Sequence, residues 1–149
     1  MPGVIALPPL VFLGGLVAGV FLQWLMPVKL FPPGSSFVPG MLLCLAGGAV
    51  GGWGFVTLLL AGTAVRPDRP TTLLVTGGPF RFSRNPLYLS LAMCYLGTTF
   101  LFNALWPLIT FAPMLVVVHR GIIVREERYL EAKFGDAYRT YKSRVRRWL

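Results

Sequence analysis

The sequence predicts an all-α membrane protein with about four transmembrane helices and a C-terminal amphipathic helix at the membrane interface. Two observations support this fold class. The chain of 149 residues is 55% hydrophobic and 13% charged, and its mean hydropathy is +0.68, far more apolar than a soluble domain of this size. Its apolar residues also form runs of bilayer length, separated by segments rich in Pro, Gly and charge. We expect a single domain over residues 1–149.

Four apolar runs give the predicted spans, at about residues 4–26, 37–65, 86–102 and 104–124. The third span is short, roughly 25 Å at helical rise, and it joins the fourth so tightly that we expect an antiparallel helical hairpin. The first two spans carry small residues four apart, a spacing that lets helices pack closely. These are Gly14, Gly15, Ala18, Gly19, Gly47, Gly48, Gly51 and Gly52. We interpret them as a packing seam.

Positive charge is distributed unevenly along the chain. The connection 66–84 holds four of the 14 Lys and Arg residues and the tail from Arg120 holds nine, which leaves only Lys29 on the opposite side of a four-span protein. The positive-inside rule therefore places both termini in the cytoplasm, for a protein of an inner or plasma membrane. The net charge of +9 indicates anionic lipid headgroups as partners. Nucleic acid is not expected, because no nucleic-acid-binding motif is present.

The tail 125–149 alternates basic residues with aromatic and apolar ones at three- and four-residue intervals, which is typical of a helix on a membrane surface. The interiors of the four spans lack Asp, Glu, Lys and Arg. Coupled transport usually needs an ionisable group inside the membrane, so this composition counts against a transporter. A non-catalytic scaffold or small transporter stays an alternative. Cys44 and Cys94 lack metal-ligand spacing, and we predict no metal site.

Two polar stretches fall on the predicted cytoplasmic side. Residues 77–88 indicate a basic, turn-rich entry into a helix, with Asn85 at the N-cap and Pro86 at the first helical position. Such a helix start attracts anions. In the second stretch, 125–128, the last apolar run gives way to charge that includes Glu126 and Glu127. We predict that the two stretches meet and form a cofactor site.

S-adenosylmethionine suits such a site. Its carboxylate needs N–H donors or a cation, its ammonium needs acceptors, and its adenine needs an apolar slot. The helix start, with Arg81 and Arg84 nearby, offers donors for the carboxylate, and the two glutamates offer acceptors for the ammonium. The apolar slot for the adenine is offered by Leu73, Leu74, Phe80 and Tyr88. Methyl transfer from a sulfonium mainly requires positioning and desolvation, so no nucleophilic side chain is needed.

A family resemblance lies in the same two stretches, extended to LVTGGPFRFSRNPLY at 74–88 and REERYLEAKFGDAY at 125–138, with Tyr141 following. Together they closely resemble the isoprenylcysteine carboxyl methyltransferases and the related phospholipid methyltransferases. The resemblance covers about the C-terminal half. It implies a helical membrane methyltransferase that binds S-adenosylmethionine between its last two spans and the C-terminal segment. The acceptor would be a lipophilic small molecule or a lipidated group.

The resemblance also implies cofactor contacts, carried over by position. They fall on Thr72, Leu73, Leu74, Val75, Phe80, Asn85, Pro86, Leu87, Tyr88 and Glu127. Glu126 is added for its charge. His119 is added because it lies seven residues before Glu126 and on nearly the same helix face, although contact with water or lipid is an equal alternative for it.

Two departures from the family pattern affect the predicted activity. Asn85 replaces the histidine of the prenylcysteine enzymes and is the form common in phospholipid methyltransferases, so phospholipid N-methyltransferase is an alternative function. Ile123 stands where the prenylcysteine enzymes place an arginine, and we assign no catalytic residue. NADPH-dependent sterol reductases share a similar helix start, but they have Gly and Glu where this chain has Leu89 and Ser90. A reductase therefore ranks behind a methyltransferase.

Overall fold

The computed structural model describes residues 7–63, 65 and 71–149. Residues 4–6 and 64 of the predicted spans, and Arg66 and Arg69 of the charge count, lie outside these described residues. The elements are α1 (Pro8–Leu25), α2 (Phe37–Leu60), the 3-10 turn η1 (Gly78–Arg81), α3 (Pro86–Leu101), α4 (Leu105–Val118), the π-helical turn η2 (His119–Ile123), α5 (Val124–Phe134) and α6 (Asp136–Arg144). No strand occurs within the described ranges.

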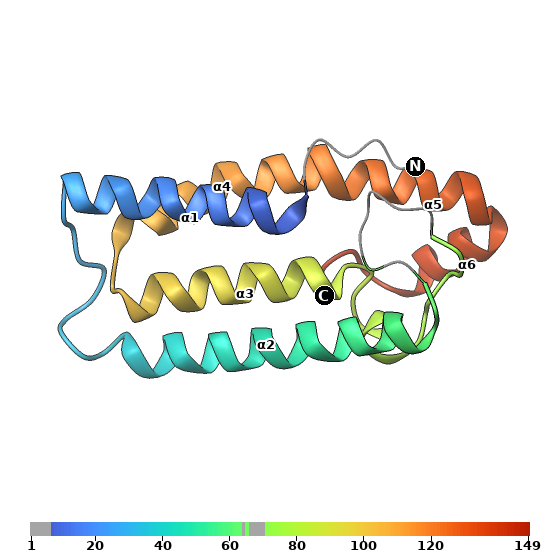
Figure 1. Ribbon diagram of the computed structural model, residues 1–149, viewed down its shortest axis with the longest axis horizontal. Helices are drawn as coiled ribbons and strands as arrows, with labels where there is room; N and C mark the ends of the chain where they lie inside the picture. The colour runs from blue at the N-terminus through green and yellow to red at the C-terminus, as the bar shows by residue number, and fades with distance from the viewer. Residues whose placement is uncertain (1–6, 64, 66–70) are drawn as a thin grey trace.

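The predicted all-α membrane fold is confirmed. Helices α1 and α2, and the continuous helix Leu105–Phe134, are long and apolar enough to cross a membrane. The apolar helix α3 is shorter, at 16 residues. These helices lie side by side along the long axis of the molecule, and α3 lies between α2 and the pair formed by α1 and α4 (Figure 1).

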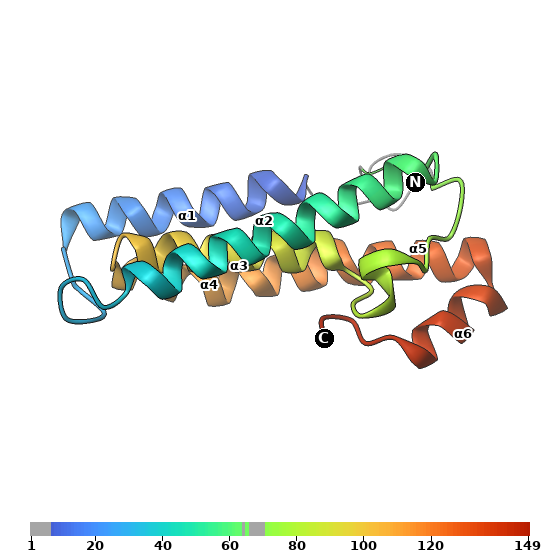
Figure 2. The ribbon, with the colours of Figure 1, turned by 90° about the horizontal axis from the view of Figure 1, so that it is seen from below.

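The two ends of the bundle differ in composition. The hairpin end (residues 26–36 and 102–104) holds the connections from α1 to α2 and from α3 to α4. The polar end (residues 71–85 and 125–149) holds η1, the start of α3, α5 and α6 (Figures 1 and 2). The alternating connections therefore bring the two predicted site stretches to the same end.

Glycines allow close packing within the bundle. An added Cβ at Gly47 would lie 2.8 Å from Cys94 Sγ on α3, and one at Gly19 would lie 2.5 Å from the Cα of Pro107 on α4. The predicted seam is therefore present where these glycines face a neighbouring helix. It does not extend to Gly14, Gly48 or Gly52, where an added Cβ would meet nothing within 4 Å.

Asn103 organises the hairpin end. The sequence predicts Asn103 as the cap of the fourth span, but the N-cap of α4 is Ala104, and α4 begins at Leu105. Asn103 itself has a φ of 49°, and its Oδ1 accepts hydrogen bonds from the backbone N–H groups of Leu30 and Phe31 at 3.1 and 2.9 Å. Its Nδ2 donates to the Phe31 carbonyl at 2.8 Å. One neutral amide thereby joins the two connections at this end.

The helix that begins with α4 continues through η2 into α5 and ends at Gly135, which has a φ of 51°. The helix can end at Gly135 because glycine adopts a positive φ without steric cost. Within η2 the Val124 N–H bonds the His119 carbonyl five residues back. This π-helical turn adds one residue to the helix and shifts the face of every side chain that follows.

Candidate cofactor-binding site

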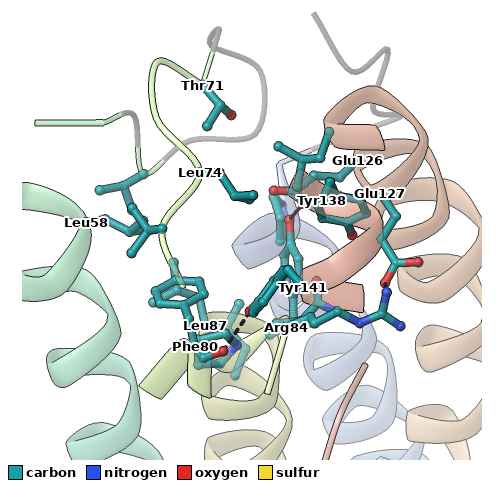
Figure 3. Close-up of a pocket in the computed structure, with 18 of the residues that line it drawn as sticks. Leu58, Thr71, Leu74, Phe80, Arg84, Leu87, Glu126, Glu127, Tyr138 and Tyr141 are labelled. Atoms are coloured by element: carbon teal, nitrogen blue, oxygen red, sulfur yellow. Dashed lines mark hydrogen bonds and ion pairs between the residues drawn. The ribbon is translucent and has the colours of Figure 1, made fainter. Parts of the chain in front are cut away.

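A cavity of about 430 Å³ lies at the polar end. It is bounded by the segment 71–75, the start of α3, α5 and α6, and it extends to the start of α1 and the end of α2 (Figure 3). Its lining includes these residues singled out from the sequence: Leu73, Leu74, Val75, Phe80, Asn85, Pro86, Leu87, Tyr88, Glu126 and Glu127. The two polar stretches therefore meet in one cavity.

The structure places Thr72 outside this lining. Its backbone N–H bonds Thr63 Oγ1 at 3.2 Å, and its own hydroxyl donates to the Gly62 carbonyl at 3.3 Å. Thr72 is thus held by the chain that follows α2. Its neighbour Thr71 contributes to the cavity instead.

His119 also lies elsewhere. It lines a second cavity together with Leu115, Val116, Arg120 and Trp148. The expectation that His119 shares a face with Glu126 assumed an uninterrupted α-helix. Because η2 adds one residue, the side chain that aligns with His119 is Glu127, and both contact Arg147.

The cavity includes residues that were not assigned to it from the sequence. Tyr138 and Tyr141 of α6 line it, and the Tyr141 hydroxyl donates a hydrogen bond to the Phe80 carbonyl at 2.7 Å. Their three-residue spacing fitted a surface helix, and they were assigned no contact, although both belong to the stretch that carries the family resemblance. The remaining lining is Leu7, Pro8, Pro9, Leu10, Leu58, Val65, Thr71, Leu91 and Leu130, together with Arg84, which the sequence had indicated as a partner for the carboxylate of the cofactor. Most of these side chains are apolar.

An ion cluster forms one wall of the cavity. The buried Glu127 carboxylate accepts two hydrogen bonds from the Arg147 guanidinium, from Nε to Oε1 at 3.0 Å and from Nη2 to Oε2 at 2.7 Å. Arg84 Nη1 lies 3.3 Å from Glu127 Oε1 (Figure 3). That ion pair lacks hydrogen-bond geometry, and the buried Nε and Nη1 of Arg84 have no hydrogen-bond partner among the described residues. One carboxylate thus faces two cations.

Glu126 has a different environment. Its Oε2 accepts a hydrogen bond from the Tyr88 hydroxyl at 2.6 Å. This contact joins α5 to the first turn of α3, the two elements that the sequence predicted to meet. The cavity therefore contains an acceptor on α5 and unsatisfied donors on Arg84, with apolar side chains on its other walls.

The surrounding phenols stay protonated well above neutral pH. Burial and the charge of Glu127 raise the pKa of Tyr138 to about 12, against the opposite influence of Arg84. Burial and the neighbouring Tyr138 also raise the pKa of Tyr141. The hydrogen bond to Glu127 raises the pKa of Arg147. At neutral pH the site therefore holds neutral phenols beside charged guanidinium groups.

The start of α3 is as predicted in position but not in its side-chain contacts. Asn85 occupies the N-cap and Pro86 the first helical position, yet Asn85 makes no side-chain cap hydrogen bond. Its Nδ2 instead donates to the Arg147 carbonyl at 3.0 Å. The first turn of α3 is therefore not capped by Asn85, and it borders the cavity.

This fold and site define a class: a helical membrane protein whose apolar helices end in a cavity with both a cation and a carboxylate. A family model described as phospholipid methyltransferase matches residues 35–137. The chain belongs to this family, which confirms the family resemblance of the two polar stretches and places it among membrane methyltransferases.

Two relatives extend this finding. An uncharacterized protein of Haemophilus influenzae is 48% identical over 65 residues, which cover 42% of this chain and 100% of that protein. The protein-S-isoprenylcysteine O-methyltransferase of Schizosaccharomyces pombe is 34% identical over 73 residues, which cover 49% of this chain. The aligned part is 31% of the Schizosaccharomyces pombe enzyme.

Proposed function

We propose that this protein transfers a methyl group from S-adenosylmethionine, bound in the polar-end cavity, to a lipophilic acceptor taken from the bilayer. One observation carries this proposal: Arg84 and the Glu126 carboxylate line the same cavity. The buried Nε and Nη1 of Arg84 lack hydrogen-bond partners within the described part of the chain. A zwitterionic amino acid group needs that combination of donor and acceptor.

The residues present fit this cofactor. A buried donor without a hydrogen-bond partner costs free energy. Arg84 Nη1 is ion-paired with Glu127, but Nε and Nη1 of Arg84 have no hydrogen-bond partner among the described residues, and this favours a bound anion such as a carboxylate. Glu126 supplies an acceptor for the ammonium. The apolar side chains of Leu73, Leu74 and Leu87 offer a slot for the adenine. The cavity volume of about 430 Å³ lies in the usual range for small-molecule sites.

When bound, the cofactor supplies an electrophilic methyl group on its sulfonium. The residues of the chain bind it, orient it and exclude water. The Tyr88 hydroxyl holds the Glu126 carboxylate in place, and the Tyr141 hydroxyl ties α6 to the chain at Phe80, beside the cavity. Rates of such displacements depend on alignment and desolvation, so this division of roles requires no nucleophilic side chain.

The apolar part of the lining indicates the acceptor class. The cavity reaches Leu7 and Leu10 at the start of α1 and Leu58 near the end of α2. Helix α1 packs on α4 while α2 packs on α3, and this arrangement favours entry of an apolar group near the ends of α1 and α2. We propose an isoprenylcysteine-like or other lipophilic acceptor. A phospholipid amine is the second candidate, favoured by Asn85 at the α3 start.

The side of the membrane is part of the proposal. The polar end carries most of the described Lys and Arg residues, and Lys29 lies at the hairpin end. The positive-inside rule then places the cavity on the cytoplasmic side, where S-adenosylmethionine is available. Anionic headgroups would contact the exposed basic residues of α6.

The test uses detergent-purified full-length protein. S-adenosylmethionine and its demethylated product S-adenosylhomocysteine are expected to raise the apparent melting temperature, because each binds the native state. Incubation with methyl-labelled cofactor and a total membrane lipid extract should then label a lipid, which mass spectrometry identifies. Protection by NADPH alone would point to a reductase. Absence of protection by any of these nucleotides would point to a scaffold or transporter and overturn the proposal.

A further inference from the structure

The last five residues fold back along the start of α3, and we call residues 145–149 the C-terminal strap (Figures 1 and 2). The backbone N–H of Arg84 donates to the Arg146 carbonyl at 2.9 Å. Ser83 Oγ and Asn85 Nδ2 both donate to the Arg147 carbonyl, at 3.3 and 3.0 Å. The strap thus engages three consecutive residues that lead into α3.

Arg147 links this strap to the opposite wall of the cavity. While its carbonyl holds Asn85, its guanidinium holds Glu127 through two parallel hydrogen bonds and lies 3.3 Å from His119 Nε2. Trp148, the next residue, packs against the buried apolar cluster around Val118. Arg147 is not itself among the side chains that line the cavity. It contacts residues that do line it, from both polar stretches.

We infer that Arg147 is a positioning residue for the cofactor site, and this inference rests on the function proposed above. Its two hydrogen bonds satisfy both oxygens of the Glu127 carboxylate. Arg84, which is 3.3 Å away and lacks hydrogen-bond geometry to Glu127, therefore keeps its donors for a ligand. Bidentate pairs between arginine and carboxylate are the strong, geometrically specific ones, which is what this role requires.

Loss of Arg147 has a specific consequence in this arrangement. Among the described residues, Glu127 would be left with Arg84 as its only charged partner, and we expect Arg84 to turn and hydrogen-bond it fully. The donors available to the carboxylate of the cofactor would then be withdrawn. The proposed adenine slot, lined by Leu73, Leu74 and Leu87, would be unaffected, and so would binding of the adenosine part of the ligand. A purely structural role for Arg147 would instead weaken both parts alike.

Calorimetry with two ligands separates these possibilities. S-adenosylhomocysteine carries the amino acid group, whereas 5′-methylthioadenosine lacks its carboxylate and ammonium. Arg147→Gln is expected to lower the affinity for S-adenosylhomocysteine about 10-fold or more, as for the loss of a hydrogen bond to a charged group. The affinity for 5′-methylthioadenosine should stay unchanged. Arg147→Lys keeps the charge with a single donor and should fall between the wild type and Arg147→Gln.

Arg146→Gln is the matched control, because it removes the same charge from the neighbouring residue, whose side chain is exposed. It should bind both ligands like the wild type. Equal losses for both ligands in Arg147→Gln, or no loss for either, would overturn the inference while leaving the proposed function intact. If Arg147→Gln does not fold, Arg147→Lys takes its place with the same selective loss expected. A wild type that binds neither ligand overturns the proposed function, and the inference with it.

Discussion

The two ends of the bundle join their helices through different kinds of chemical group. Each end must join helices that are far apart in sequence. At the hairpin end, neutral groups do this: the Asn103 amide bonds the backbone of Leu30 and Phe31, and the Trp106 indole donates to the Met26 carbonyl at 2.7 Å. At the polar end, a buried carboxylate and two guanidinium groups lie between α3, α5 and the strap.

This difference indicates which end has a role beyond holding the helices together. Amides and backbone groups are sufficient to join helices, as the hairpin end demonstrates. Burying ions is expensive, and replacing a buried ion pair with apolar residues is often neutral or stabilising. The fold therefore gains little from Arg84 and Glu127 as charges. Their presence supports the proposal that a charged ligand binds here.

The largest expected effect is from Arg84→Gln at the polar end. This change removes the guanidinium donors that lack hydrogen-bond partners among the described residues. The affinity for S-adenosylhomocysteine should therefore fall about 10- to 100-fold, the usual result of losing hydrogen bonds to a charged group. Calorimetry on purified protein measures the loss. Affinity equal to that of the wild type would exclude Arg84 from the site. The charged groups of the polar end would then have no functional explanation.

Glu127→Gln should weaken cofactor binding by about 10-fold, because a charged partner of the two arginines is lost and their orientation relaxes. The control is Arg144→Gln, in the exposed last turn of α6, for which binding should not change. The same calorimetric titration compares the two. Equal affinities for both variants would exclude Glu127 from the site.

Asn103→Ala tests the hairpin end. It removes three hydrogen bonds and places alanine at a φ of 49°, a conformation that disfavours side chains other than Asn and Gly. The melting temperature without ligand should fall by several degrees, whereas S-adenosylhomocysteine affinity should stay within about twofold of the wild type. A large loss of affinity would show that the two ends are coupled.

The smallest effect at neutral pH is expected from Tyr138→Phe. In the wild type the pKa of Tyr138 is raised to about 12, above its ordinary value near 10. Its stabilising contribution is thus complete below about pH 10 and lost as pH rises through about 12. The melting temperature should fall less steeply with rising pH between these two values in Tyr138→Phe than in the wild type. Identical pH profiles for the two proteins would show that the pKa of this hydroxyl does not differ between the folded and the unfolded state.

Much of the architecture was predictable because bilayer physics constrains it. Apolar runs of spanning length, turn residues between them and Gly135 as a helix stop depend on local sequence alone. The meeting of residues 77–88 with Glu126 and Glu127 was also predictable, since an alternating four-span arrangement brings them to the same end.

What the sequence did not predict depends on contacts between distant segments. The π-helical turn η2 has no clear sequence signal, and it moves His119 away from the cavity. Whether Tyr138 and Tyr141 face lipid or the cavity depends on how α6 folds back after Gly135. The role of Arg147 required knowing that the strap returns to α3, because a basic tail alone is typical of a membrane anchor.

The length of α3 has a consequence for where the reaction would take place. At 16 residues it is about 24 Å long, some 6 Å less than the hydrocarbon thickness of a typical bilayer. Local thinning of the membrane is one way to relieve a hydrophobic mismatch of this size. The Asn85 end of α3 would then lie at headgroup depth, so that a lipid acceptor could present its polar group while its tail stays among the other tails.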